Sequence, residues 1–244
     1  MNNKMYMSGT GNNFVISEYN GEKTDIEIVS IVADTFYDID GVIFIEKINK
    51  NTVKMHYFNN DGSTAELCVN GIRCVAKYSY DNEFVESNKI TVIAPIGEIK
   101  TIVDDNVVSI EINKPSYDKN KILIDNYECV IANIGNPHLL IEVSDLENFN
   151  LIDFAKKVNE SEKLEGEPNI EIYKLTEKKF IQARVHERGV GETDACGSGA
   201  ICLFYYLFDN HKIDNDSFVL YPGGELEMTF KDNTIHLKGE VTYL

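Results

Sequence analysis

The stretch ETDACGSGAIC, residues 192–202, places a cysteine at the opening of a glycine-rich turn, directly before the apolar run 200–208. The stretch CVNGIRC, residues 68–74, repeats this arrangement earlier in the chain, so that both read C-x-x-G-x-x-C. Cys68 and Cys196 are 128 residues apart (196 minus 68), which is close to half of the 244-residue chain. The sequence therefore predicts two half-length repeats, each with one cysteine at the start of a helix.

Most of the remaining residues form a pattern of short strands joined by tight polar turns. Strands in 41–58 and 96–113 flank the turns Asn49-Lys50-Asn51 and Asp104-Asp105-Asn106, and 217–239 forms a similar series. Alternating apolar and polar residues around Asn, Asp and Gly turns are typical of hairpins. We therefore expect largely antiparallel sheets.

Helices are few. Two of them, 68–81 and 196–209, begin at the cysteines, while 25–34 and 148–159 have an amphipathic pattern. The helix at 196–209 is apolar on nearly every face, which is typical of a helix enclosed by other structure. These features predict an α/β fold with two pseudo-symmetric halves, each a largely antiparallel sheet or barrel wrapped around a central helix.

The turn-forming residues Asn113-Lys114-Pro115-Ser116 mark the predicted boundary between the halves. The N-terminal half is expected at 1–113, and a C-terminal strand at about 238–244 could return to it. The C-terminal half is expected at 114–237. We expect the active site in the cleft between them.

Composition narrows the class of protein. The formal net charge of −17 argues against a nucleic-acid partner, which needs a basic surface, and against an anionic membrane. No apolar run reaches the roughly 18 residues that span a bilayer, and the first residues lack the apolar core of a secretion signal. Five cysteines, an odd number, indicate reduced thiols. We therefore expect a cytoplasmic protein.

A cysteine at a helix start meets unpaired backbone N–H groups and the positive end of the helix dipole. Both stabilise a thiolate and are expected to lower the thiol pKa. Small or polar residues follow each cysteine, Asn70-Gly71 in one repeat and Gly197-Ser198-Gly199 in the other. Such a turn can also bind a carboxylate.

Two such turns facing each other would suit one particular reaction. A carboxylate held by both helix ends places the adjacent Cα between two sulfurs, so that one thiolate removes the Cα proton and the opposite thiol delivers another. The result is inversion of configuration without a cofactor. The site must stabilise the developing carbanion and exclude water.

Three simpler roles for the cysteines compete with this one. A buried cysteine is more often a small hydrophobic residue, which is our interpretation of Cys74, Cys129 and Cys202. A zinc site is disfavoured, because ligand pairs usually come as C-x₂₋₄-C. A thiol-redox pair is the third alternative, but the C-x-x-C motif is missing.

The chain resembles the diaminopimelate epimerase family over essentially its whole length. Five pieces carry the resemblance in the right order, and they are 9–14 (GTGNNF), 58–63 (FNNDGS), 68–73 (CVNGIR), 135–138 (GNPH), and 187–200 (ERGVGETDACGSGA). The resemblance implies two α/β halves that close over the substrate and a place in lysine biosynthesis. It also implies cofactor-independent epimerisation of LL-diaminopimelate to the meso form, with Cys68 and Cys196 as the acid/base pair.

The same resemblance implies roles for further residues. His138 and Glu187 would tune the pKa of the cysteines. The backbone N–H groups of Val69, Asn70, Gly197 and Ser198 would bind the reacting carboxylate. Asn12 and Asn136 would help to fix the substrate. Asn59, Asn169 and Arg188 would bind the distal carboxylate, and the carbonyls of Glu187 and Arg188 would bind the distal ammonium. No cofactor and no metal are implied, and the family tends to form homodimers.

Three departures from the family pattern leave the substrate open. Val69 stands where the family usually has glycine, Asn13 replaces an aspartate, and 37–41 (YDIDG) keeps only the aspartate of a glycine-rich segment. Valine disfavours positive φ and would crowd the carboxylate site. A two-thiol racemase of another amino acid, such as histidine, is therefore the first alternative. A non-catalytic amino-acid-binding protein is a more distant one.

Overall fold

The computed structural model describes residues 4–64, 67–161, 163–164 and 166–244. The first three residues of the predicted N-terminal half lie outside this range. The chain divides into two compact units, one of Met1–Ile112 with Lys238–Leu244 and one of Asn113–Leu237. We call these the N-terminal unit and the C-terminal unit.

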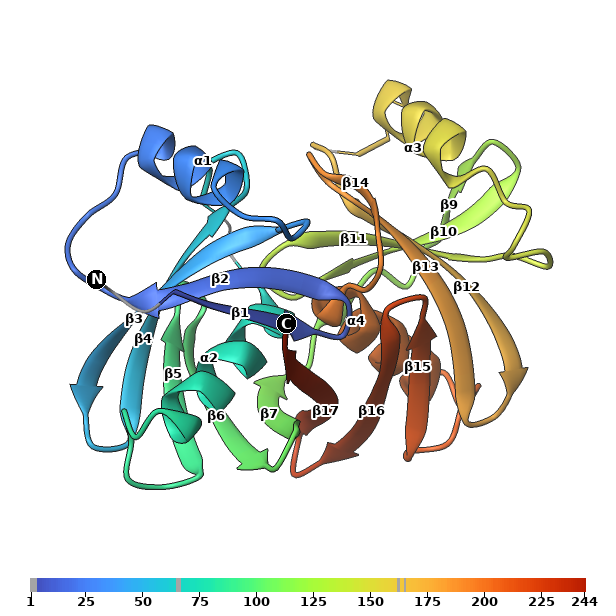
Figure 1. The fold of residues 1–244 in the computed structure, drawn as a ribbon. Helices are drawn as coiled ribbons and strands as arrows, with labels where there is room; N and C mark the ends of the chain where they lie inside the picture. The colour runs from blue at the N-terminus through green and yellow to red at the C-terminus, as the bar shows by residue number, and fades with distance from the viewer. Residues whose placement is uncertain (1–3, 65–66, 162, 165) are drawn as a thin grey trace. The chain divides into compact units, whose positions relative to one another are not determined.

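The strands of the N-terminal unit, to which the last strand of the chain contributes its residues from Lys238 on, form a closed ring (Figure 1). Pairing runs in the order β1–β2–β3–β4–β5–β6–β7–β17 and returns from β17 to β1, which closes the sheet into a barrel. The bounds are β1 (Met5–Gly9), β2 (Asn12–Glu18), β3 (Gly41–Asn49), β4 (Thr52–Asn59), β5 (Lys89–Ala94), β6 (Gly97–Asp104), β7 (Val107–Asn113) and β17 (Thr234–Tyr243).

The C-terminal unit repeats much of this pairing. Strand β10 pairs with β8, β9 and β11, and the sheet continues through β12 and β13 to β15 and β16, with β14 beside β13. The bounds are β8 (Ser116–Tyr117), β9 (Ile122–Ile124), β10 (Tyr127–Asn133), β11 (Pro137–Glu142), β12 (Asn169–Glu177), β13 (Phe180–Glu187), β14 (Gly191–Thr193), β15 (Ser217–Tyr221) and β16 (Gly224–Lys231).

Each helix connects two parallel strands. The helices are α1 (Asp25–Ala33), α2 (Val69–Asp81), α3 (Leu151–Glu160) and α4 (Gly197–Asp209). They link the parallel pairs β2/β3, β4/β5, β11/β12 and β13/β15, while the hairpin-connected pairs are antiparallel. The largely antiparallel character is confirmed. The parallel pairs arise because a helical crossover returns the chain in its original direction.

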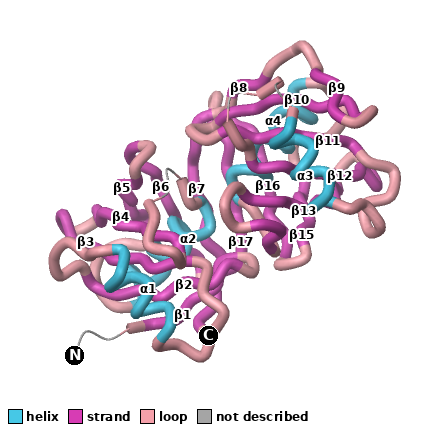
Figure 2. The backbone as a smooth tube through the Cα atoms, turned by 90° about the horizontal axis from the view of Figure 1, so that it is seen from above, coloured by secondary structure: helices cyan, strands magenta, loops and turns pink. Residues whose placement is uncertain are grey.

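The predicted internal repeat and central helices are confirmed. Helices α2 and α4 have 13 residues each and start 128 residues apart (197 minus 69). Every residue is buried from Val69 to Ser79 in α2 and from Gly197 to Leu207 in α4. Figure 2 shows how strand (magenta) dominates both units around these helices (cyan). The fold is α/β with two pseudo-symmetric units.

The two remaining helices differ from each other. Helix α3 is amphipathic as predicted, with Leu151, Phe154, Ala155 and Val158 buried. Helix α1 also packs with one face, since Ile28 is buried and Ile31 and Val32 lie partly buried against the same cluster. It differs from α3 in that further apolar side chains stay exposed, among them Ile26, which is 82% exposed.

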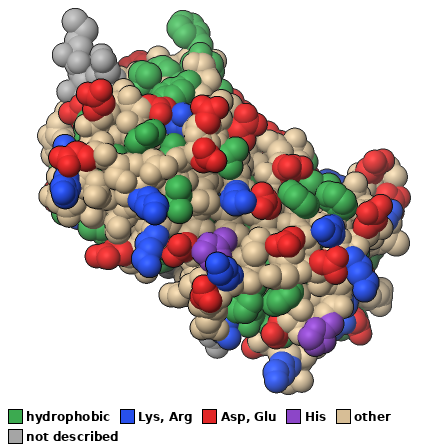
Figure 3. Space-filling model, turned by 90° about the horizontal axis from the view of Figure 1, so that it is seen from below, with side chains coloured by type: hydrophobic (Ala, Val, Ile, Leu, Met, Phe, Trp, Pro, Cys, Tyr) green, Lys and Arg blue, Asp and Glu red, His purple; other side chains and the backbone are tan. Residues whose placement is uncertain are grey.

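Charges of both signs are interspersed at the surface. On the face in Figure 3, Lys and Arg side chains (blue) lie scattered among Asp and Glu (red) and do not gather into one stripe. Among the described residues, no helix is long and apolar enough to cross a membrane.

Candidate functional site

Cys68 caps helix α2. Its backbone is extended (φ −131°), and its sulfur accepts a hydrogen bond from the N–H of Gly71 at 3.3 Å. An extended residue whose side chain accepts from the third helical N–H is the usual N-cap geometry. The predicted placement of this cysteine at a helix start is confirmed.

Cys196 caps helix α4 in the same way. Its φ is −126°, and its sulfur accepts from the N–H of Gly199 at 3.4 Å. The hydroxyl of Ser198 lies 3.3 Å from the sulfur. Cys196 is buried, whereas Cys68 is partly exposed. The two cysteines therefore share their backbone setting and differ in access to solvent.

The expected conflict between Val69 and a positive φ does not arise in the backbone. Val69 is the first residue of α2, and it is not among the residues with positive φ. A helical residue does not need glycine, so the N–H of Val69 keeps its place at the helix start. Its side chain is buried.

In the N-terminal unit, Asn12 and Asn70 lie together. The amide of Asn70 donates to Oδ1 of Asn12, and its own Oδ1 accepts from Arg73 at 3.0 Å. Arg73 also donates to Oγ1 of Thr10 at 2.6 Å. Thr10 has a positive φ of 53°, which is strained for a β-branched residue. This network ties the β1–β2 turn to the start of α2.

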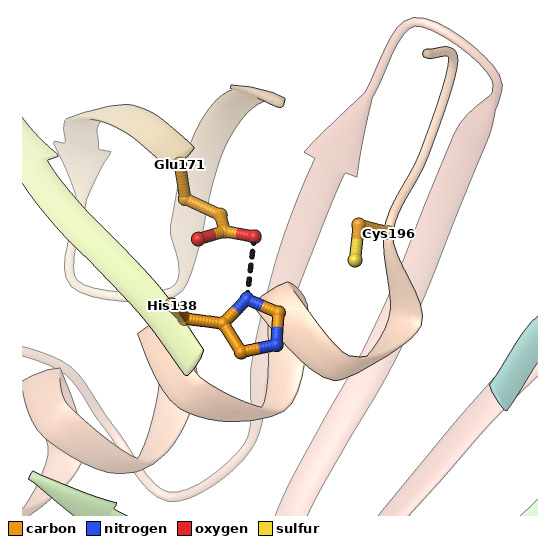
Figure 4. Close-up of side chains that lie close together, drawn as sticks. All are labelled: His138, Glu171 and Cys196. Atoms are coloured by element: carbon orange, nitrogen blue, oxygen red, sulfur yellow. Dashed lines mark hydrogen bonds and ion pairs between the residues drawn. The ribbon is translucent and has the colours of Figure 1, made fainter. Parts of the chain in front are cut away.

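In the C-terminal unit, His138 and Glu171 converge beside Cys196 (Figure 4). Nδ1 of His138 lies 2.8 Å from Oε1 of Glu171, and both side chains are fully buried. Nε2 of His138 lies 3.1 Å from Oδ1 of Asn136. One donor atom each from His138, Glu171 and Cys196 lie within 4.8 Å of one another. The predicted residue His138 is therefore close to Cys196, and Asn136 contacts His138.

These three donor types could hold a metal ion. Both ring nitrogens of His138 already contact protein oxygens, however. The arrangement therefore favours a hydrogen-bonded cluster, and we assign it no metal.

Helix α4 leaves room for the Glu171 carboxylate because it has a glycine at 199. A Cβ built on Gly199 would overlap Oε1 of Glu171 and lie 2.7 Å from its Cδ. Any side chain there would push the carboxylate out of place. The second glycine of the motif is thus explained by the packing of Glu171.

Asn169 and Arg188 lie close to each other. Oδ1 of Asn169 accepts from the backbone N–H of Arg188 at 2.9 Å, and Glu187 accepts from the hydroxyl of Thr193 at 2.5 Å. Asn59 lies in the N-terminal unit, where its amide bonds to Tyr57 and Ser63. The structure thus joins Asn169 to the 187–188 segment and places Asn59 in a hydrogen-bonded turn.

The expected lowering of the thiol pKa does not hold for Cys196. Burial, together with the charges of Glu187 and Glu171, raises the pKa of Cys196 well above 9.0. The hydroxyl of Ser198 and the N–H of Gly199 act in the opposite direction and are outweighed. The local helix-start effect is therefore smaller here than the tertiary surroundings.

The three remaining thiols lie in the core. Burial raises the pKa of Cys74 to about 12 and of Cys129 to about 11. Burial and Glu171 raise the pKa of Cys202 well above 9.0. Thiols that stay protonated are poor nucleophiles, which fits the interpretation of these cysteines as small hydrophobic residues.

Two buried charged residues, Glu171 in the C-terminal unit and Arg73 in the N-terminal unit, were not predicted from the sequence. Each is a single charged residue in an otherwise apolar segment, NIEIY at 169–173 and GIRCVA at 71–76. Both are fully buried. The available signal was a charged residue within an apolar segment that is expected to be buried.

The sequence matches a known protein family. Residues 5–117 and 130–244 match the profile of the family described as diaminopimelate epimerase. The diaminopimelate epimerase of Brachyspira hyodysenteriae is 31% identical, with 97% of this chain and 95% of that protein covered. That of Thermotoga maritima is 30% identical, with 97% and 98% covered.

Solved structures share the fold at low sequence identity. A phenazine biosynthesis protein of the PhzF family from Enterococcus faecalis has a TM-score of 0.75 and 12% identity, covering 99% of this chain and 96% of its own. A hydroxyproline epimerase from Agrobacterium vitis has a TM-score of 0.74 and 11% identity, covering 99% and 90%. The family profile and the near-full-length relatives lead to one conclusion: this chain is an isomerase that belongs to the diaminopimelate epimerase family.

Proposed function

We propose that the protein converts LL-diaminopimelate to meso-diaminopimelate with Cys68 and Cys196 as its acid/base pair and without a cofactor. The observation that carries the proposal is the repeated N-cap. Each unit presents one cysteine at the first turn of a buried helix, and each sulfur accepts from the third N–H of that helix. Near-full-length relatives named diaminopimelate epimerase support the substrate.

The proposed reaction moves two protons. One sulfur, as thiolate, takes the Cα proton and becomes a thiol, and the electron pair left on Cα is stabilised through the carboxylate. The other sulfur, as thiol, gives its proton to the opposite face of Cα and becomes the thiolate. The N–H groups of Val69, Asn70, Gly197 and Ser198 would bind the carboxylate where its negative charge increases.

The remaining predicted residues keep their proposed roles. Asn12 and Asn136 would orient the reacting end, and His138 and Glu187 would tune the thiols. The effect of the Glu187 charge on the pKa of Cys196 supports its part in this. Asn59, Asn169 and Arg188 would bind the distal carboxylate, and the carbonyls of Glu187 and Arg188 would bind the distal ammonium.

The five free cysteines suit a reducing compartment. A cytoplasmic location and a homodimer stay predictions.

A two-thiol racemase of another amino acid is the second candidate. One observation favours it, namely that the segment 37–41 (YDIDG) departs from the family pattern. Relatives in fold include a hydroxyproline epimerase and a probable proline racemase. The two candidates share a mechanism and differ in the distal group of the substrate.

Replacing Arg188 by alanine is expected to separate these candidates. If Arg188 binds a distal carboxylate, Arg188→Ala lowers kcat/KM for diaminopimelate about 10–100-fold, mostly through KM, because a charged hydrogen bond contributes about 1.5–3 kcal/mol. The measurement is steady-state kinetics with diaminopimelate and a panel that includes histidine and glutamate. The Arg188→Lys variant, which keeps the charge but not the planar fork, should fall between. Unchanged kinetics with diaminopimelate, beside turnover of another amino acid, would favour the second candidate.

A further inference from the structure

The two cysteines have different electrostatic surroundings. Because the internal repeat relates the two units, the side chains near each cysteine can be compared at equivalent positions. The 128-residue offset between α2 and α4 also relates β3 to β12, which start at Gly41 and Asn169. Glu171 in β12 thus corresponds to Ile43 in β3. A Cβ on Gly199 would meet Glu171, and a Cβ on Gly71 would meet Cδ1 of Ile43 at 3.0 Å. Each of these side chains therefore faces the glycine of the cysteine-capped helix in its own unit.

The neighbouring strand shows a second exchange. His138 pairs in register with Asn169, and Phe14 pairs in register with Gly41, so His138 corresponds to Phe14. Phe14 and Ile43 are buried apolar residues. The C-terminal unit thus has a buried polar pair beside its cysteine where the N-terminal unit has apolar packing.

In the helices the difference is reversed, because the charged residue lies in the N-terminal unit and the apolar residue in the C-terminal unit. Arg73 in α2 corresponds to Ile201 in α4, and both are fully buried. The guanidinium donates to Asn70, the second residue of the helix that Cys68 caps, and to Thr10. Among the described residues its Nε has no hydrogen-bond partner, and Asn70 and Thr10 are both neutral. A buried cation with neutral hydrogen-bond partners favours a negative charge nearby.

We propose that, in the resting protein, Cys68 is the thiolate and Cys196 is the thiol, because Arg73 and Glu171 place opposite charges in the two units. This assignment deepens the proposed function and rests on it. Arg73 and Glu171 are positioning residues: they act through the cysteines, by favouring the thiolate at Cys68 and the thiol at Cys196. The resting protein would therefore start with the epimer whose Cα–H faces Cys68.

The groups around each sulfur support this assignment. Cys196 faces Glu171 from β12, Glu187 from β13, Tyr221 from β15 and His138 from β11. Burial and the two carboxylates raise the pKa of Cys196. Any positive charge on His138 is offset by the 2.8 Å contact with Glu171.

Arg73 brings a charge of the opposite sign to Cys68. Burial lowers the pKa of Arg73 to about 10, so the guanidinium is still charged at neutral pH, and negative charge on Cys74 or Cys68 opposes that lowering. The attraction is mutual, and it favours the thiolate of Cys68. Cys74 stays protonated, because burial raises its pKa to about 12.

Thiolate absorbance in the ultraviolet tests the assignment without depending on access to the sulfur. The full chain, Cys68→Ser and Cys196→Ser are titrated in reduced form from weakly acidic to alkaline pH. Near neutral pH, Cys68→Ser is expected to lose the thiolate signal and Cys196→Ser to keep it. Loss in Cys196→Ser, or in neither variant, would overturn the assignment.

Charge variants test its cause. In the Cys68→Ser background, Glu171→Gln keeps the shape and the acceptor for His138, and it should lower the pH at which Cys196 titrates by about one to three units. In the Cys196→Ser background, Arg73→Met should raise the titration of Cys68, and Arg73→Lys should leave it nearly in place. A Cys196 titration that is unmoved by Glu171→Gln would refute the role of Glu171.

Proton exchange separates this inference from the proposed function. If diaminopimelate exchanges its Cα proton while the thiolate is on Cys196, the thiolate assignment is refuted and the proposed function stands. If the thiolate is on Cys68 but no amino acid exchanges, the proposed function fails and the charge assignment stands.

Discussion

Replacing Cys68 or Cys196 by alanine is expected to lower kcat/KM for epimerisation by about 10²–10⁴-fold or more, since each removes one of the two proton transfers. Cys196→Ala should still exchange the Cα proton of one epimer with solvent, without inversion, because the Cys68 thiolate can take and return a proton on its own face. In Cys68→Ala, burial and carboxylates keep Cys196 protonated near neutral pH, so exchange of the other epimer should appear only at higher pH. The measurement is kcat/KM in both directions, together with deuterium incorporation into each epimer.

The chain provides matched controls for this experiment. Cys74 and Cys202 end the same C-x-x-G-x-x-C motifs, and both are buried thiols with raised pKa values. Cys74→Ala and Cys202→Ala should keep kcat/KM within about tenfold, although each leaves a small cavity. Retained epimerisation in Cys68→Ala or Cys196→Ala would contradict the two-thiol mechanism.

Replacing Gly199 by alanine is expected to lower the free energy of unfolding by about 1–3 kcal/mol, the usual cost of overpacking a core. The added Cβ would overlap the Glu171 carboxylate, which is fully buried and bonded to His138. Alanine is otherwise the better helix former by about 1 kcal/mol, so a loss of stability would show that packing dominates. Denaturant-induced unfolding measures the difference.

Gly71 in the other repeat is the control for this prediction. A Cβ there would meet Cε of Met55 at 2.9 Å, which is the end of a flexible side chain. Gly71→Ala should therefore cost less than Gly199→Ala. The double variant Gly199→Ala/Glu171→Ala should be less destabilised than the sum of its single changes, because the clash is gone. Equal effects at the two glycines would count against a packing role for Gly199.

Local patterns predicted much of the fold. The hairpin turns 49–51 and 104–106 and helices α2, α3 and α4 lie close to where the sequence placed them. The repeated motif located both N-cap cysteines because capping depends on only a few adjacent residues. The parallel pairs were not predicted, since pairing across a helical crossover leaves no short-range signal in the sequence.

The electrostatics of the site could not be predicted in the same way. Cys196 has the helix start that lowers a thiol pKa, yet its pKa is raised by burial and by carboxylates from β12 and β13. Glu171 lies 25 residues before Cys196 (196 minus 171), and Arg73 lies within an apolar helix segment. Their effect depends on which strand and helix face each other, and that is decided by tertiary packing.

The most direct measurement is proton NMR of LL-diaminopimelate with the reduced protein in D₂O, without added cofactor. We expect loss of the Cα–H signal and appearance of the meso isomer, both abolished in the double variant Cys68→Ala/Cys196→Ala. Exchange that persists in the double variant, or no exchange with the unchanged protein, would contradict epimerisation of diaminopimelate by these two cysteines.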